Sequence, residues 1–413
     1  MVEVIKKHGF VWPNYDGGSN ANILASLVKL LRPDTEMDRQ LLPPLDDKHL
    51  SWVGQEIDRI VLMVLDGLGF DLLQEYVSEH PNSLFASLMR HGYLAPITSV
   101  VPSTTATAMA SIWNGVPASV HLVSGYEIFM SEIGMMVNTL KSSPVQADES
   151  GMLEKMGVKF ESFFKTGELQ NSLINQDIKL FVLLNRFIVE SPLSMVIYRH
   201  FTKKIGTVNL QDQLYMVREL LQKETPPMII GAYWPALDSL SHHYGYSHEV
   251  WECEMNCIST SLETMLSKLD GSVRRKTLFV ITADHGFRHS PPDNSVYLED
   301  YPEIVDNLLM PPIGESRFRY LYIRNGLVDE TLEMIRERLS PDFVAFKSVE
   351  AYESGLFGPQ VSDKFLTRIG DIVVTPAGDK NLIFRKDDTD ELIGRHGGLT
   401  RREMIVPFLA FVP

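Results

Sequence analysis

The chain has 413 residues, of which 44% are hydrophobic, and its formal net charge is −15. This hydrophobic content supports a large core and excludes an intrinsically disordered chain. The acidic balance argues against general nucleic-acid binding, but it leaves a small phosphate substrate open because bound metals invert the local field. No apolar run reaches the roughly 20 residues that a membrane helix needs, so we expect no membrane partner.

The N-terminal segment and the cysteines bear on cellular location. Residues 1–15 contain neither a long apolar stretch nor a cleavage site, so they do not resemble a signal peptide. The two cysteines, Cys253 and Cys257, lie four positions apart in an expected helix. We interpret them as a buried, reduced pair, because two cysteines at this spacing do not make a disulfide framework. We therefore expect a cytoplasmic protein.

Helix-like and strand-like apolar patterns alternate along the chain. In chain order, the first expected elements are a helix at 19–33, a strand at 59–65, a helix at 70–90 and a strand at 95–101. A helix that starts within 103–105 and ends at Asn114-Gly115 follows. The remaining elements are a helix at 207–223, a strand at 227–233, a helix at 248–269 and strands at 277–282 and 405–413. Short strands that are apolar throughout and alternate with helices are typical of a parallel sheet covered on both faces. We therefore predict an α/β fold with a mostly parallel central sheet flanked by helices.

Two ranges interrupt this alternation. Residues 130–205 mix Met-rich and charged pieces, and we interpret them as a cap-like insertion. Residues 315–390 combine expected strands with a helix at 328–339, which suggests a small α+β insertion. Both belong to what we expect to be a single catalytic domain over 1–413.

Acidic residues directly follow two of the buried strands. Asp66 comes after the strand at 59–65, and Asp284-His285 comes after the strand at 277–282. Ligands of open α/β sheets bind beyond the carboxyl ends of the strands, so we expect these side chains to meet at one edge. Carboxylates and imidazoles together can hold a divalent metal.

Two further segments offer metal ligands. Asp238 and His242 follow the strand at 227–233 and are four positions apart, so a helical turn presents both on one face. The glycine-rich loop at 394–398 adds His396. Each also has a structural explanation, since such pairs are common on surfaces and a histidine in a glycine loop is often a hydrogen-bonded turn residue.

Hydroxyl side chains cluster at the start of the helix near residue 103. They belong to Ser103, Thr104, Thr105 and Thr107. The free backbone N–H groups and the dipole at a helix N-terminus favour an anion, although one hydroxyl can simply cap the helix. A threonine becomes an effective nucleophile when a metal or a base lowers its pKa, and a metal at the edge of the sheet would do so.

In this order, the motifs resemble the alkaline phosphatase superfamily, and most closely its type I phosphodiesterase/nucleotide pyrophosphatase family. The resemblance runs from about residue 59 to the C-terminus, and its most specific string is Ala283-Asp284-His285-Gly286. It implies an alkaline-phosphatase-like fold with two divalent metal ions. We expect zinc, while manganese or iron would suit the same ligands. The ligand sets that the resemblance implies are Asp66, Thr105, Asp284 and His285 for one metal, and Asp238, His242 and His396 for the other.

The resemblance also indicates the nucleophile and the reaction. Thr105 lies ten residues before Gly115, the spacing of the family nucleophile, and would form a covalent phosphothreonine. The family has an asparagine where this chain has Tyr126, whose hydroxyl can hold a phosphoryl oxygen instead, and this departure bears on nucleotide specificity. The superfamily's monoesterases usually have an arginine after the nucleophile, whereas this chain has Ala106, which favours diesters.

The expected function is therefore a metal-dependent hydrolase that cleaves phosphodiester or pyrophosphate bonds of nucleotides or related small phosphodiesters. Alternatives in the same superfamily are a phosphomonoesterase, a phosphonate hydrolase and a phosphomutase, the last of which usually carries a serine nucleophile. The alternative of another class is a non-catalytic binding protein on the same fold, against which the complete set of ligands argues. The sequence leaves the substrate and the oligomeric state open.

Overall fold

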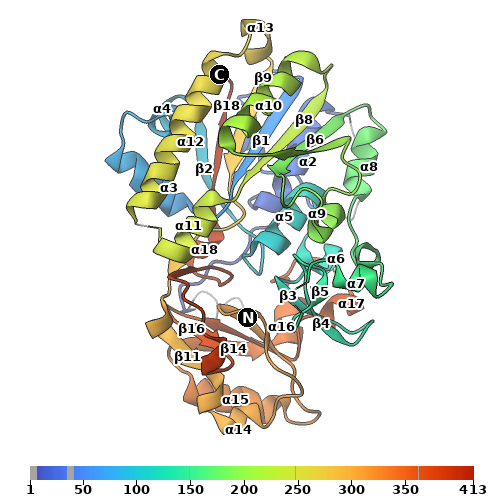
Figure 1. Ribbon diagram of the computed structural model, residues 1–413, viewed down its shortest axis with the longest axis vertical. Coiled ribbons are helices and arrows are strands. Elements are labelled where there is room, and N and C mark those ends of the chain that lie inside the picture. Colours follow the sequence, from blue (N-terminus) through green and yellow to red (C-terminus); the bar gives the residue numbers. More distant parts are fainter. Residues whose placement is uncertain (1–6, 35–40, 148, 247, 361) are drawn as a thin grey trace.

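The computed structural model describes residues 7–34, 41–147, 149–246, 248–360 and 362–413. Residues 1–6, which belong to the segment where no signal peptide is expected, lie outside the described residues. A large upper lobe surrounds the main sheet, and a smaller lobe lies below it (Figure 1). Within the part of the chain that is described, each helix is too short or too polar to cross a bilayer.

A seven-stranded sheet forms the centre of the upper lobe. Its strands, in spatial order, are β2 (Tyr93–Thr98), β18 (Ile405–Phe411), β9 (Thr277–Thr282), β1 (Arg59–Leu65), β8 (Met228–Trp234), β6 (Lys179–Asn185) and β7 (Lys203–Thr207). β18 runs antiparallel to both of its neighbours, and the other neighbouring pairs are parallel. The predicted α/β fold with a mostly parallel central sheet is confirmed.

Two groups of helices cover this sheet. α4 (Leu84–His91), α10 (Leu210–Lys223) and α12 (Glu249–Ser267) pack in one group, and α2 (Ile23–Leu31), α5 (Thr105–Asn114), α8 (Glu168–Ile174) and α9 (Pro192–Ile197) pack in the other. The central strands β1 and β9 are buried along nearly their whole length. The two groups therefore cover opposite faces, which is why these strands are apolar at every position and do not alternate.

The helix expected at 70–90 is two helices. α3 (Phe70–Glu79) ends before Pro81, and α4 begins after Ser83, whose side chain accepts a hydrogen bond from the N–H of Ala86 at 3.2 Å. A proline cannot donate to the helical ladder, and a serine at the N-cap starts a new helix. The apolar periodicity of the sequence continues across this break, so the periodicity alone predicts a single helix.

The range 130–205, expected to form a cap, is divided between two parts of the fold. β6 and β7 belong to the central sheet. The small sheet of β3 (Glu127–Met130), β4 (Met135–Asn138) and β5 (Ser143–Pro144) lies apart from it. The cap interpretation is therefore wrong for residues 179–205. Their apolar run is short and follows a long irregular stretch, so its pattern alone does not distinguish a core strand.

The smaller lobe contains an antiparallel four-stranded sheet with its own apolar core. The strands are β12 (Ile313–Glu315), β13 (Phe318–Leu321), β15 (Ile372–Pro376) and β14 (Phe343–Lys347), with α14 (Pro302–Val305) and α15 (Val328–Arg338) beside them. These elements overlap the range in which a small α+β insertion is expected. The parallel pair β11 (Ser295–Tyr297) and β16 (Asn381–Ile383) lies in the same part of the molecule (Figure 1).

The interpretation of the two cysteines as a buried pair is wrong. Cys253 and Cys257 are both free and exposed on α12. The apolar face of this helix is formed by Trp251, Met255 and Ile258, which are buried. Both thiols therefore lie on the solvent side of the helix.

Candidate metal centre and active site

Three neighbouring strands of the central sheet bring the acidic residues together. Asp66 directly follows β1, and Asp284 and His285 follow β9. Asp238 lies in the first turn of α11 (Ala236–Tyr244), which follows β8. Since β1 pairs in parallel with both β8 and β9, the three strand ends are adjacent, and these side chains meet at one edge of the sheet.

The Nε2 atom of His285 lies at the centre of this cluster. It is 3.4 Å from Oδ2 of Asp284, 3.5 Å from Oδ1 of Asp66 and 4.0 Å from Oδ1 of Asp238. The hydroxyl of Thr105 lies 3.2 Å from the same nitrogen. The nucleophile expected from the sequence is thus in contact with the expected metal ligands.

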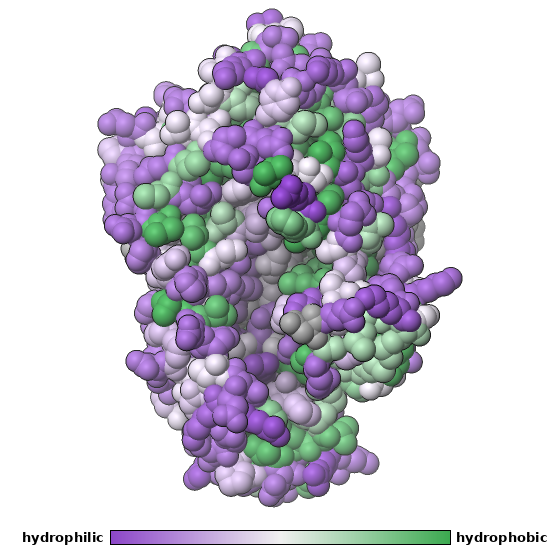
Figure 2. All heavy atoms as spheres, viewed as in Figure 1, coloured by the Kyte–Doolittle hydropathy of each residue, from purple (hydrophilic) through white to green (hydrophobic). Residues whose placement is uncertain are grey.

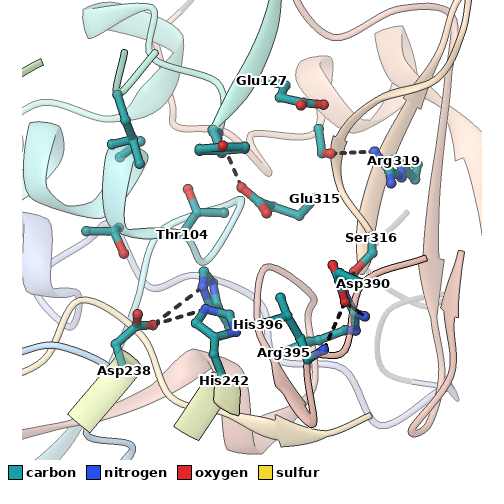
Figure 3. Close-up of a pocket in the computed structure, with 16 residues that line it drawn as sticks. Thr104, Glu127, Asp238, His242, Glu315, Ser316, Arg319, Asp390, Arg395 and His396 are labelled. Atoms are coloured by element: carbon teal, nitrogen blue, oxygen red, sulfur yellow. Dashed lines mark hydrogen bonds and ion pairs between the residues drawn. The ribbon is translucent and has the colours of Figure 1, made fainter. Parts of the chain in front are cut away.

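Two more imidazoles complete the cluster on the side of Asp238. Its Oδ1 lies 3.4 Å from Nε2 of His242 and 3.7 Å from Nε2 of His396. The rings of His285 and His396 stack with their centroids 3.6 Å apart. Figure 3 shows Asp238, His242 and His396 grouped on one side of a cavity. The structure therefore brings together all seven residues expected to bind metal.

The imidazoles are oriented by the backbone. In each ring Nδ1 contacts a carbonyl oxygen: that of Gly394 for His242 (2.8 Å), that of Gly286 for His285 (3.1 Å) and that of Ser103 for His396 (3.2 Å). These contacts assign the N–H to Nδ1 and leave the lone pair on Nε2, which faces the cluster. A metal-binding histidine commonly donates its other N–H in this way.

The aspartates present oxygens that lack a hydrogen-bond donor. Asp284 uses Oδ1 to accept from the N–H groups of Gly67 (3.0 Å) and His285 (2.9 Å), and Asp66 uses Oδ2 to accept from the hydroxyl of Tyr233. Their other oxygens, and Oδ1 of Asp238, are buried and have no hydrogen-bond partner among the described residues. Buried carboxylate oxygens without a donor are costly unless a cation binds them.

Electrostatic repulsion supports the same interpretation. Burial, together with the charges of Asp238 and Asp284, raises the pKa of Asp66 well above its usual range. Burial also raises the pKa of Asp238. Burial and the two neighbouring imidazoles lower the pKa of His396 well below its usual range. Bound cations would remove the repulsion between the carboxylates, so these residues fit divalent metals.

The candidate ligands form two overlapping groups. Asp66, Asp284 and His285 make one group, and Asp238, His285 and His396 make the other, each with ligand atoms within 4.8 Å of one another. His285 belongs to both. Two adjacent cation positions with mixed carboxylate and imidazole ligands suit zinc and similar transition metals.

Thr105 differs from the other hydroxyls at the start of α5. It is the first residue of the helix and is partly exposed to the cavity. Thr104 is the N-cap, and its side chain accepts from the N–H of Thr107. The side chains of Ser103, Thr104 and Thr107 are buried. Gly115, with a φ of 64°, ends the helix in the left-handed conformation that glycine adopts without strain.

A cavity of about 410 Å³ opens beside Thr105. This is the size of a site for a small molecule. Figure 3 shows Glu127, Glu315 and Arg319 across the cavity from Asp238 and His242, and Tyr126 also lines the cavity. In Figure 2 the surface is hollowed between the upper and lower lobes, so the cavity is bounded by residues from both.

Tyr126 lies in the cavity wall, as the sequence suggests, but its polar groups are engaged. Its hydroxyl accepts from the side chain of Asn138 at 2.6 Å, and its N–H donates to Glu315 at 3.2 Å. Burial raises its pKa. As a neutral phenol that accepts from Asn138, it can donate one hydrogen bond to a phosphoryl oxygen.

Several charged residues of the cavity wall were not identified from the sequence. Glu315 is partly buried, and burial together with the charge of Glu127 raises its pKa to about 7. Arg319 donates to two backbone carbonyls, and Arg395 pairs with Asp390. These side chains come from loops and from the smaller lobe, and no motif or spacing in the sequence connects them with the metal ligands.

The fold and this site define a hydrolase of the alkaline phosphatase superfamily. The family model for type I phosphodiesterase/nucleotide pyrophosphatase matches residues 60–399. The chain belongs to this family. A comparison with curated protein sequences gives no match.

Solved structures share the fold at low sequence identity. Murine ectonucleotide pyrophosphatase/phosphodiesterase 5 is 17% identical with a TM-score of 0.66, and the match covers 86% of this chain and 88% of that one. The human protein of the same name is 19% identical with a TM-score of 0.64, over 85% and 87%. Phosphonoacetate hydrolase from Sinorhizobium meliloti 1021 is 18% identical with a TM-score of 0.63, over 86% and 90%.

Proposed function

We propose that this hydrolase cleaves small phosphodiesters, including nucleotide-type substrates, through a covalent phosphothreonine on Thr105. One observation carries the proposal. The hydroxyl of Thr105 faces the cavity and lies 3.2 Å from Nε2 of His285, among buried carboxylate oxygens without donors. A nucleophile next to candidate cation ligands and at the start of a helix is arranged for attack on an anionic phosphoryl group.

The proposed metals are two zinc ions. Asp66, Thr105, Asp284 and His285 would hold one, and Asp238, His242 and His396 would hold the other. When bound, they would lower the pKa of the nucleophile and neutralise charge on the phosphoryl oxygens and the leaving group. The donor-free carboxylate oxygens and the inward Nε2 atoms support this assignment.

The first turn of α5 orients the phosphoryl group. The N–H groups of Thr105 and Ala106 are the first two of the helix and have no acceptor within it. They can donate to phosphoryl oxygens while the helix dipole favours the negative charge. The oxygen of Thr105 then forms a bond to phosphorus as the bond to the leaving alcohol breaks. In the second half of the reaction, water replaces Thr105 on phosphorus and restores the hydroxyl.

The cavity favours a substrate with one negative charge at phosphorus. Ala106 provides no cation where a monoesterase usually has an arginine, and the carboxylates of Glu127 and Glu315 lie in the opposite wall. A dianionic monoester meets repulsion there, and the two arginines that line the cavity are already engaged, Arg319 with backbone carbonyls and Arg395 with Asp390. Hydrolysis of phosphonates is the second candidate, because phosphonoacetate hydrolase shares the fold over most of both chains.

A substrate panel tests the proposal. We expect kcat/KM for bis(4-nitrophenyl) phosphate to exceed that for 4-nitrophenyl phosphate and for phosphonoacetate, in protein loaded with zinc. Acid quenching during turnover should leave phosphate on Thr105, detected by mass spectrometry of the peptide. Much faster hydrolysis of the monoester would reject the diester assignment. Rapid release of phosphate from phosphonoacetate would favour the second candidate.

A further inference from the structure

A buried ion pair joins the two lobes behind the metal centre. Glu403 lies in α18 (Arg401–Met404), just before the central strand β18, and Arg317 lies between β12 and β13 of the smaller lobe. Oε1 of Glu403 accepts from Nε of Arg317 at 2.6 Å, and Oε2 accepts from Nη2 at 2.9 Å. Both side chains have 0% exposure. This geometry is bidentate, the arrangement in which arginine fixes a carboxylate most firmly.

The same carboxylate holds the loop that carries His396. It accepts from the N–H of Gly398 at 2.9 Å and from the hydroxyl of Thr400 at 2.5 Å. The carbonyl of Gly398 in turn accepts from the hydroxyl of Ser103 at 2.8 Å, and the carbonyl of Ser103 contacts Nδ1 of His396. The carboxylate of Glu403 is therefore connected to the orientation of this imidazole through three successive hydrogen bonds, by way of Gly398 and Ser103.

The backbone of Glu403 supports a second ligand. Its carbonyl oxygen accepts from the N–H of Gly286 at 2.8 Å, directly after His285. A side chain at Gly286 would collide with the backbone of Arg402, so the two segments are in close contact. The short helix α18 thus contacts the loops of both stacked imidazoles.

Arg317 fixes the opposite wall of the cavity. Its guanidinium donates to the carbonyls of Lys380 (2.6 Å) and Gly378 (2.9 Å), in addition to the carboxylate. The hairpin that carries it also carries Glu315 and Arg319, two positions before and after, which line the cavity. The ion pair therefore connects the wall that faces the substrate with the loop of a metal ligand.

We propose that Arg317 and Glu403 are a positioning pair, which sets the imidazole of His396 and holds the wall of the smaller lobe at a fixed place opposite Thr105. The role rests on the proposed function, since it concerns the metals and cavity of that site. A buried ion pair need not stabilise a protein, because apolar residues of similar volume often replace one at no cost. The carboxylate of Glu403 also accepts hydrogen bonds from two donors of the loop that carries His396, so we assign the ion pair to positioning this loop rather than to stability.

The first variant is Glu403→Gln, which keeps the shape of the side chain and removes its charge. Removal of a partner hydrogen-bonded directly to a metal ligand typically costs about 10–100-fold in metal affinity, and because Glu403 acts through Gly398 and Ser103 we expect the lower end of this range. We expect a loss of this size for the metal on the His396 side, measured by competition with a chelator, and a changed absorption spectrum of the cobalt-substituted protein. The chelator assay does not depend on activity, so it remains informative if the proposed reaction is wrong.

The matched control is Glu132→Gln. Glu132 pairs with Arg368, another fully buried arginine, at 3.0 Å, and neither residue is among the candidate ligands or the cavity lining. We expect this variant to lower the melting temperature and to leave the metal affinity within twofold of the original. Similar losses of affinity in both variants would overturn the proposal, because they would indicate a general loss of stability.

A double variant distinguishes a positioning role of the ion pair from a contribution to stability. In Arg317→Met with Glu403→Leu, apolar side chains replace both charges, so no unpaired charge remains to unfold the protein. We expect its melting temperature to lie above that of Glu403→Gln while its metal affinity stays at least tenfold weakened. Recovery of metal affinity together with stability would overturn the positioning role. If neither variant folds, Thr400→Val removes one donor to the carboxylate, and an unchanged metal affinity and cobalt spectrum in that variant would count against the proposal.

Discussion

Thr104 and Thr105 are adjacent in sequence but occupy different environments. The hydroxyl of Thr104 is buried and caps α5. The hydroxyl of Thr105 borders the cavity and lies 3.2 Å from His285. Both positions suit a helix start, so hydroxyl clustering alone does not separate them. The two positions are distinguished by the contact of Thr105 with His285, a candidate metal ligand.

Substitutions at these two positions should therefore have different effects. We expect Thr105→Ala to fold, to keep metal and to lose several orders of magnitude in kcat, because the covalent route is gone. Thr105→Ser should retain activity, since it keeps the hydroxyl. Thr104→Ala should lose about 1 kcal/mol of stability and most of the activity should remain. Steady-state kinetics and thermal unfolding check these outcomes. Phosphate trapped on Thr104 or Thr107, with an active Thr105→Ala protein, would overturn the assignment.

The carboxyl of Glu315 predicts a pH-dependent selectivity. Burial and the charge of Glu127 raise its pKa to about 7, so it is mostly neutral at pH 6 and mostly charged at pH 8. A charged Glu315 should repel a carboxylate on the substrate by roughly 1–2 kcal/mol. We therefore expect kcat/KM for an aryl phosphodiester that carries a carboxylate to fall about tenfold as the pH rises between these values, relative to the same diester without the carboxylate. In Glu315→Gln the ratio should be constant, and an unchanged pH profile in that variant would assign the effect to another group.

At the scale of secondary structure, the sequence is informative where local chemistry decides the outcome. The buried strands before Asp66 and Asp284 are recognisable because each is a short apolar run closed by an acidic residue and glycine. The start and end of α5 follow from Thr104 and Gly115. These local signals predict the central sheet and place the candidate metal ligands at its edge.

Elements that depend on distant contacts were not predictable in the same way. β6 is a core strand only because β8 and β7 flank it, and its own sequence is also consistent with an insertion. Glu315 lines the cavity and Arg317 pairs with Glu403 behind it, and both come from the smaller lobe, which is placed by contacts between residues far apart in sequence. Local patterns carry no information about such packing.

The junction between α5 and α6 (Ala118–His121) should make stability sensitive to acid. His121 is fully buried, contacts the hydroxyl of Ser111 at 2.9 Å and accepts from the N–H of Val123 at 3.0 Å. Burial and the charge of Arg368 lower its pKa from 6.5 to about 3. Below pH 6.5 the unfolded chain therefore binds a proton at this imidazole, whereas the folded chain does not. Stability from this group is complete above pH 6.5 and falls by up to about 1.4 kcal/mol per pH unit between 6.5 and 3.

Urea unfolding at pH 7.0 and 5.5 tests this effect. Complete exclusion of the proton predicts a loss of roughly 1–2 kcal/mol from His121 over this interval. His121→Gln keeps hydrogen-bonding capacity and does not titrate, so its stability should depend less on pH by that amount. Titration of the candidate metal ligands affects both proteins alike and cancels in the comparison. Equal pH dependence in the two proteins would show that His121 is not the responsible group.

At the scale of the whole molecule, the candidate site depends on both lobes. The central sheet supplies the aspartates, while the smaller lobe closes the cavity and supports the loop of His396 through Arg317. The donor-free oxygens of Asp66, Asp238 and Asp284 repel one another in the folded state and are separated in the unfolded chain. Without metal, this repulsion therefore lowers the stability of the folded state, and bound metal would remove it.

We accordingly expect two divalent metal ions per chain and a strong dependence of stability on metal. Metal that binds only the folded state stabilises it by about 2.7 kcal/mol at a free concentration 100 times its Kd. Chelation should lower the melting temperature and abolish hydrolysis, and added zinc should restore both. Asp284→Ala should lose at least one metal, measured by elemental analysis, and nearly all activity, whereas Asp293→Ala, at an exposed position, should behave as the original protein. Full activity in metal-free protein would refute the metal centre, and two tightly bound metals in Asp284→Ala would remove this residue from it.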